Sequence, residues 1–276
     1  MTGHPVACIC RALRIARSTA YRGSRGRPRF YRRQDDDVVL KQIKAVTRQR
    51  ASYGHRRVTV LVNRRSETKY NHKRIRRIMR MNGLQLPRKR RARNGRPHTG
   101  RVQTEQSNTR WSSDILEIPC WNGEVVHLGF AIDCHDREVL SDIARDRDLT
   151  GAEIRQLMTD AISRRFPDGR PERPIQWLSD NGGQYTALET LLHAEQFGLQ
   201  PITTPRSSPE SNGMSEAFVN TLKRDYVESA MLWTAERVIL QIPGWIEDYN
   251  TQAPHSSLGM KSPTEYRAEM TLLASP

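Results

Sequence analysis

The 276-residue sequence has no run of about 18 apolar residues, so we expect no segment that spans a membrane. Residues 1–22 contain arginine but lack the apolar stretch and the small-residue cleavage site of a secretory signal. Four cysteines (Cys8, Cys10, Cys120 and Cys134) are few for a disulfide scaffold. His4 lies near the first two of them, but the three match no zinc-ligand spacing. These absences favour a cytoplasmic protein with reduced thiols.

Acidic residues are scarce in the first part of the chain. Residues 1–110 contain 31 lysines and arginines but only 5 aspartates and glutamates, whereas residues 111–276 contain 14 and 25. The net charges of these two parts are therefore +26 and −11. Such a concentration of positive charge predicts a polyanionic partner, because each neutralised phosphate releases condensed counterions. An RNA binder of the ribosomal type and a solvated tail are the alternatives.

The basic part has the periodicity of short helices. Val39, Ile43 and Val46 share one helix face, and a second helix is predicted over 55–64. A third is bounded by Asn71 as N-cap and Gly83 after its end. Five basic residues cover the other faces of this last helix: Lys73, Arg74, Arg76, Arg77 and Arg80. Three short helices with a basic third one favour a DNA-binding helix-turn-helix module over a small bundle with a solvated surface.

The rear part begins with three strands. WSSDILEI from Trp111 alternates, Asn122-Gly123 predicts a hairpin, and EVVHLGFAIDC and REVLSDIA follow. A helix with a Thr150–Glu153 capping box comes next, then strand IQWLSD, a helix over 187–197, strand LQPIT, and helices over 213–230 and 234–250. This order predicts an α/β domain of the ribonuclease-H-like type, a mixed five-stranded sheet with flanking helices.

Three carboxylates in this part are candidates for a metal site. Asp114 shares a strand face with Leu116 and Ile118, Asp180 ends a strand before Asn181-Gly182-Gly183, and Glu216 lies early in a helix. Converging carboxylates repel one another unless cations neutralise them, and hard oxygen ligands suit Mg²⁺ or Mn²⁺. Two such ions activate a water or a 3′-hydroxyl and stabilise the leaving oxygen in phosphoryl transfer. Taken singly, each of these acids is more often a cap, a turn residue or an ion-pair partner.

The strings DNGGQY, SPESNGMSEAFVNTLKRDY and YN..APHSSLGMKSPTEY resemble the DDE transposases of bacterial insertion sequences. The resemblance is to the proteins encoded by a second, frameshifted reading frame, which are related to the retroviral integrase core. Thirty-five residues separate Asp180 from Glu216, as in this family, and Trp111 and Asp114 fit its W-x-x-D pattern. Lys223 stands where the family has a basic residue, on the helix face of Glu216 and Asn220. Ala253 departs from the pattern, since many relatives have arginine there.

This resemblance implies metal-dependent nicking and strand transfer by Asp114, Asp180 and Glu216 with two Mg²⁺ or Mn²⁺ ions. It implies DNA partners, the insertion-sequence ends and the target, and a homo-oligomer in a synaptic complex near the nucleoid. It also implies fusion to an upstream reading-frame product. Candidate DNA contacts are the basic residues of the third helix, those of a linker, and two of the helix that carries Glu216; the last two groups are Lys89, Arg90, Arg91, Lys223 and Arg224.

The expected organisation follows the charge and periodicity. A basic helical remnant with a linker is expected over 1–34, the helix-turn-helix module over 35–86 and a basic linker over 87–106. The ribonuclease-H-like integrase core is expected over 107–268, and a tail over 269–276.

Some alternatives stay open. For Asp133, bonding to turn amides or to Arg137 is favoured over catalysis, and the same holds for Asp136 at this turn. His255 either touches DNA or caps a turn. A non-catalytic DNA-binding regulator, or a ribonuclease-H-like nuclease acting on RNA–DNA hybrids, is the competing function.

Overall fold

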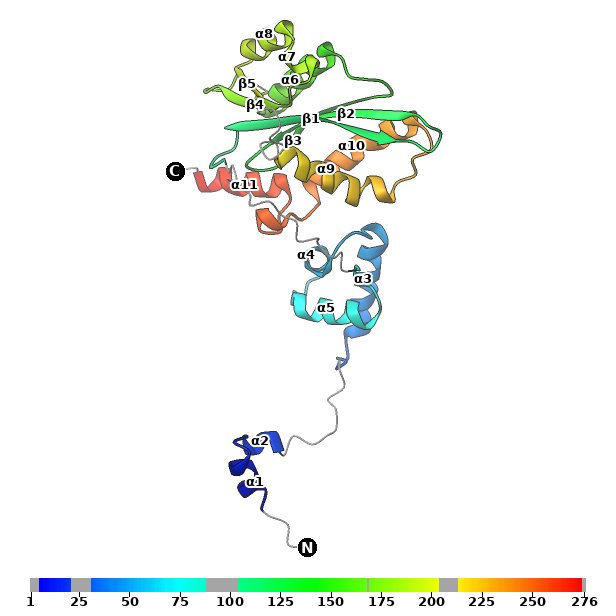
Figure 1. Ribbon diagram of the computed structural model, residues 1–276, viewed down its shortest axis with the longest axis vertical. Coiled ribbons are helices and arrows are strands. Elements are labelled where there is room, and N and C mark those ends of the chain that lie inside the picture. Colours follow the sequence, from blue (N-terminus) through cyan, green and yellow to red (C-terminus); the bar gives the residue numbers. More distant parts are fainter. Residues whose placement is uncertain (1–4, 21–30, 88–103, 168, 204–212, 275–276) are drawn as a thin grey trace.

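The computed structural model describes residues 5–20, 31–87, 104–167, 169–203 and 213–274 (Figure 1). Lys89, Arg90 and Arg91, most of both predicted linkers, and the SPESNG loop before Gly213 therefore lie outside the described residues. Within those ranges, no helix has the length and apolar character needed to cross a membrane. Two short helices, α1 (Val6–Ala12) and α2 (Arg17–Ala20), precede the first packed unit.

The first packed unit consists of three helices, as predicted: α3 (Asp36–Gln49), α4 (His55–Arg65) and α5 (His72–Met81). Their apolar stripes meet in one buried cluster, which includes Val39, Val58 and Ile75. The predicted ends of α5 are confirmed. The Asn71 side chain accepts a hydrogen bond from the amide of Lys73, and Gly83 has the left-handed φ of 68° that glycine tolerates.

The second unit is built on a five-stranded mixed sheet in the order β3-β2-β1-β4-β5. Antiparallel pairing joins β1 to β2 and β2 to β3, whereas β1 pairs with β4, and β4 with β5, in parallel. The strands are β1 (Arg110–Pro119), β2 (Val125–Asp133), β3 (Val139–Arg145), β4 (Ile175–Ser179) and β5 (Leu199–Thr203). The predicted sheet is confirmed.

Helices cover both faces of the sheet (Figure 1). One face packs against α6 (Gly151–Arg165), α7 (Gly183–Thr186) and α8 (Leu188–Gln196). The other packs against α9 (Gly213–Asp225) and α10 (Ala235–Thr251). The predicted capping box at the start of α6 is present, since the Glu153 carboxylate accepts hydrogen bonds from the amide and hydroxyl of Thr150.

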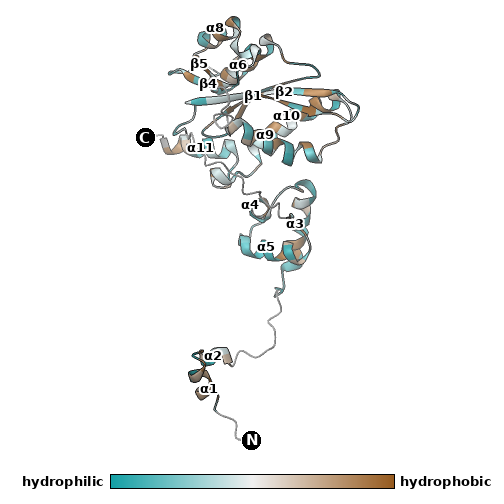
Figure 2. Cartoon of the chain, viewed as in Figure 1, coloured by the Kyte–Doolittle hydropathy of each residue, from teal (hydrophilic) through white to brown (hydrophobic). Residues whose placement is uncertain are grey.

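The last helix, α11 (Pro263–Ala274), runs across the boundary between 268 and 269, where the sequence analysis ended the core and began a tail. Two 3-10 turns, η2 (Val227–Ser229) and η3 (Ser256–Leu258), connect the helices in this part of the chain. In Figure 2 hydrophilic and hydrophobic segments alternate along α3, α4 and α5. Most apolar residues of these three helices belong to the buried cluster, although Val38 of α3 is exposed.

Candidate active site

Asp114 lies on the face of β1 that points toward α9. Residues of a strand alternate between its two faces, so Asp114 shares this face with the buried Leu116 and Ile118, which pack with Phe218 of α9. The predicted face is therefore confirmed. Asp114 is half-buried, and its Oδ1 accepts a hydrogen bond from the amide of Ile115 at 2.8 Å. A carboxylate in this position is costly unless charge or hydrogen bonds compensate it.

Asp180 follows the last residue of β4, the strand beside β1. The parallel register pairs Arg110 with Gln176 and Ser112 with Leu178. Two residues further along both strands, this register brings Asp114 beside Asp180. The amide of Gly182 donates a hydrogen bond to Asp180 Oδ1 at 3.0 Å and fixes the carboxylate at the start of α7.

Glu216 lies in the first turn of α9 on its exposed side. Its neighbour Ser215 is fully buried and forms a hydrogen bond of 2.7 Å with Ser112, two residues before Asp114 on β1. This bond ties the beginning of α9 to the strand that carries Asp114. Asn220 and Lys223 are exposed on the same helix face as Glu216, one and two turns further on.

Asp180 and Glu216 act electrostatically on Asp114. The pKa of Asp114 is raised, first by burial and then by the negative charges of Asp180 and Glu216. The described residues nevertheless include no group of three or more His, Cys, Asp or Glu side chains close enough to hold a metal ion. The three acids come from β1, from the end of β4 and from the first turn of α9. Their donors are all carboxylate oxygens, which suit a hard divalent cation.

A buried tyrosine supports this group, and the sequence analysis assigned it no role. The hydroxyls of Tyr185, from α7, and Ser113 form a hydrogen bond of 2.9 Å on the face of β1 opposite Asp114. Burial, together with the charges of Asp114 and Asp180, raises the pKa of Tyr185, so this phenol stays protonated. The signal in the sequence was the last letter of DNGGQY, five residues after Asp180.

Asp133 has the structural surroundings that the sequence favoured. Its fully buried carboxylate accepts hydrogen bonds from the amides of Asn108, His135 and Asp136, and from the indole of Trp111 at 3.1 Å. Arg165 of α6 lies 3.6 Å from it, and the amide of Arg137 donates a hydrogen bond to the Asp133 carbonyl at 3.0 Å.

Arg165 also pairs with Asp136 at 3.1 Å and with Glu138 at 3.3 Å. Together these three acids attach the turn between β2 and β3 to α6. His255 likewise has an internal role. Its ring packs edge-on against Tyr249 at 4.6 Å, it precedes the turn η3, and burial lowers its pKa to about 4.

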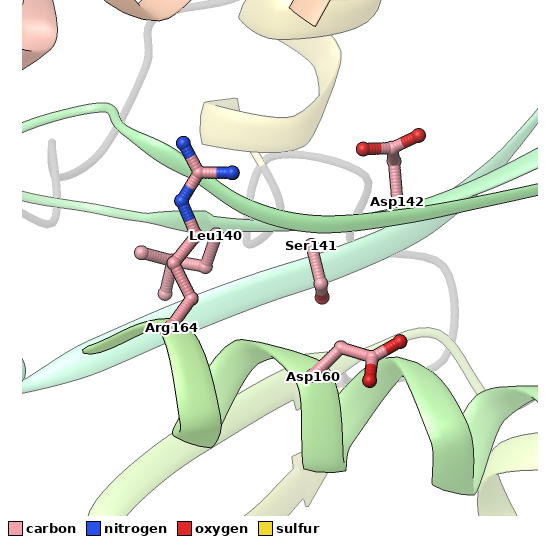
Figure 3. A pocket seen from close by; sticks show the side chains of 5 residues that line it. All are labelled: Leu140, Ser141, Asp142, Asp160 and Arg164. Carbon is pink, nitrogen blue, oxygen red and sulfur yellow. The ribbon is translucent and has the colours of Figure 1, made fainter. Parts of the chain in front are cut away.

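A second pair of carboxylates lies at the β3 edge of the sheet, in a pocket lined by Leu140, Ser141, Asp142, Asp160 and Arg164 (Figure 3). In this view Ser141 points toward α6, whereas Asp142 points away from it, so Asp142 and Asp160 do not converge. Burial raises the pKa of Asp142, and Arg164 opposes this effect. Asp142 and Asp160 therefore serve as control residues for Asp114, Asp180 and Glu216, and not as a competing metal site.

The basic residues of α5 fall into two groups. Arg74 and Arg77 form ion pairs with Asp36 at 3.1 and 2.5 Å, and Arg77 also stacks over the ring of Tyr31. These two guanidinium groups thus connect α5 to the start of α3. Lys73, Arg76 and Arg80 are exposed, as are Lys223 and Arg224 on α9; Arg224 forms an ion pair with its neighbour Asp225 at 2.7 Å.

Known families match most of the described chain. Residues 104–209 and 197–263 match the integrase core domain, and residues 34–92 match an HTH-like domain. The chain is similar to transposase InsD for the IS2 insertion elements of Escherichia coli. The two are 39% identical over 274 residues, which cover 96% of this chain and 91% of InsD.

Two further likenesses agree. The insertion element IS136 uncharacterized protein of Agrobacterium fabrum is 49% identical over 175 residues, 63% of this chain and 90% of that protein. An intasome of simian T-cell lymphotropic virus contains a chain with a TM-score of 0.50 and 16% identity, covering 85% of this chain and 75% of that one, which supports the fold alone. The chain belongs to the insertion-sequence transposases that combine an HTH-like domain with an integrase core.

Proposed function

We propose that Asp114, Asp180 and Glu216 are the catalytic carboxylates of this transposase and together bind two Mg²⁺ or Mn²⁺ ions. The observation that carries the proposal is the arrangement of three elements. The parallel β1–β4 register sets Asp114 beside Asp180, and the Ser112–Ser215 bond holds the first turn of α9 against β1. The raised pKa of Asp114 supports it: burial raises this pKa most, and the negative charges of Asp180 and Glu216, which a cation would neutralise, raise it further.

Each residue has a defined part in nicking and strand transfer. Divalent cations, when bound, activate the attacking water or 3′-hydroxyl and stabilise the leaving oxygen. Asp114 and Asp180 supply ligands from the rigid sheet, and Gly182 holds the Asp180 carboxylate through its amide. Glu216 supplies the ligand from α9. Lys223, two turns along the exposed face of that helix, binds a phosphate of the DNA being attacked.

The DNA is bound by the helix-turn-helix module. The exposed face of α5 with Lys73, Arg76 and Arg80 contacts the insertion-sequence end, because its other two arginines are engaged by Asp36. Lys89, Arg90 and Arg91 extend this contact, whereas Arg224 is engaged by Asp225. Two ends must be held for joining, so the active form is a homo-oligomer.

The test is strand transfer by the full chain on a duplex that carries the terminal repeats flanking its own reading frame. Asp114→Asn, Asp180→Asn and Glu216→Gln should each abolish the Mg²⁺-dependent product while leaving duplex binding largely intact. Asp142→Asn and Asp160→Asn, in the β3-edge pocket, are matched controls that should retain activity. Joining activity retained by any one of the first three variants removes that residue from the site.

The same assay separates the alternatives. A DNA-binding regulator would bind the duplex without cutting it in any divalent metal. A ribonuclease-H-like nuclease would cut an RNA–DNA hybrid in preference to the element-end duplex.

A further inference from the structure

The three-helix module is attached to the catalytic unit by one band of ion pairs and hydrogen bonds. Ser52 Oγ donates to Asp225 Oδ1 at 2.6 Å, and Arg57 Nη1 lies 2.6 Å from Asp225 Oδ2. Arg50 forms an ion pair with Asp248. Arg50, Ser52 and Arg57 lie in the α3–α4 turn or at the start of α4, and the two aspartates lie near the ends of α9 and α10 (Figure 1).

The band continues along α4 to α11. Arg64, two turns after Arg57 and therefore on the same helix face, donates to the carbonyl of Gln252 at 2.8 Å. It also forms an ion pair with Glu265. One face of α4 thus contacts the regions around the ends of α9 and α10 and the start of α11.

Asp225 is the most enclosed member of this band. Its side chain is 1% exposed and accepts hydrogen bonds from Ser52, Arg57 and Arg224. The guanidinium of Arg57 also stacks over the Tyr53 ring, 3.8 Å from its centroid. A buried, multiply bonded ion pair has one favoured geometry, unlike a surface pair between two long side chains.

The basic residues of the front part of the chain fall into two groups with different partners. Arg50, Arg57 and Arg64 neutralise carboxylates of the acidic rear part and face the catalytic unit. Lys73 and Arg76 of α5 are exposed and available to phosphates. The face of the module that binds DNA is therefore set relative to the face that binds the catalytic unit.

We propose that Asp225 and Arg57 are positioning residues that fix the DNA-binding module to α9, the helix that carries Glu216. The inference rests on the function proposed above. Glu216 and Asp225 are nine residues apart on one helix, so a rigid segment of about 13 Å connects the catalytic carboxylate to the module. The interval between the DNA segment bound by α5 and the phosphodiester that is cut is then set by this interface, not by the length of the linker over 87–106.

The test compares cleavage positions on the element-end duplex among variants of the full chain. Arg57→Asp and Asp225→Arg each place like charges in the interface, and the double variant restores an ion pair with reversed polarity. Wild type should cut at one phosphodiester. Each single variant should lose at least tenfold in product at this position or spread its cuts over several positions, and the double variant should regain the single position.

Two controls separate positioning from folding. Arg48→Asp makes the same charge change at an exposed site of α3 and should cut where wild type cuts. Asp225→Asn keeps the size of the side chain and should show the same defect in milder form, with an unchanged circular dichroism spectrum. Single variants that cut at the wild-type position and rate would overturn the inference.

Small-angle scattering of the free chain gives a second outcome that needs no activity. Each single variant should have a larger radius of gyration than wild type, and the double variant should return toward it. If wild type forms no strand-transfer product, the function proposed above is wrong. In that case the scattering result alone shows whether the interface holds the two units together. Equal radii of gyration for wild type and both single variants contradict the inference.

Discussion

Replacing Asp225 by asparagine tests the energetics of the contact between the two units. Burial raises the pKa of Asp225, but the hydrogen bonds from Arg224 and Arg57, the charge of Arg57 and the hydrogen bond from Ser52 outweigh it and hold this pKa at about 2, against an ordinary value of 3.8. At about 1.4 kcal/mol for each tenfold change in proton affinity, the charged carboxylate stabilises the folded chain by about 2.5 kcal/mol at pH 7. Asp225→Asn should lower the free energy of unfolding by this amount.

The direction in which this stability difference changes with pH can also be predicted. Because the pKa of Asp225 is lower in the folded chain, its contribution is complete above pH 3.8 and is lost as the pH falls from 3.8 to about 2. The difference between wild type and Asp225→Asn should therefore shrink to about 1.3 kcal/mol at pH 3. Urea denaturation followed by circular dichroism measures it, and Glu247→Gln, an exposed acid of α10, is the matched control. A difference that is below about 0.5 kcal/mol at pH 7, or that grows toward pH 3, refutes the reasoning.

Two glycines give further predictions. In Gly182→Ala the new Cβ would lie 2.8 Å from Gln184 Nε2 and 3.0 Å from Asp180 Oδ1, so the carboxylate must shift. Strand transfer should fall on the order of tenfold or more while the urea midpoint changes little, and wild-type rates would show that the position of Asp180 is not critical. In Gly129→Ala the Cβ would lie 2.7 Å from Leu149 Cδ1 and 3.3 Å from Ile143 Cγ2, inside the core. This overpacking should destabilise the chain by about 1–3 kcal/mol in urea denaturation, and an unchanged midpoint would mean that the core relaxes freely.

Local signals predicted most of the fold. The Asn71 cap, the glycine at 83 and the Thr150–Glu153 capping box act over three or four residues, and each is present in the structure. The alternation in β1 also predicted that Asp114 shares a face with Leu116. The grouping of Asp114, Asp180 and Glu216 was predicted from the spacing of the motifs. The pattern of one strand shows neither its register with the other strands nor which helix packs on it.

Contacts between distant parts of the chain were not predictable in the same way. Arg74 and Arg77 had the same pattern as the exposed basic residues of α5, and only the packing of α3 shows that Asp36 binds them. Asp225 and Arg57 are 168 residues apart, and no local rule pairs them. The pairing of Arg165 with Asp133 was not predicted for the same reason.

The central claim is that Asp114, Asp180 and Glu216 bind the same divalent cations. Fe²⁺ can be placed in Mg²⁺ sites, where ascorbate and peroxide generate hydroxyl radicals that cut the nearest peptide bonds. Mass spectrometry of the full chain treated in this way, with the element-end duplex present, should find cuts near residues 114, 180 and 216, all suppressed by excess Mg²⁺. Cuts that cluster instead near Asp142 and Asp160, or that leave out one of the three segments, would contradict the proposed site.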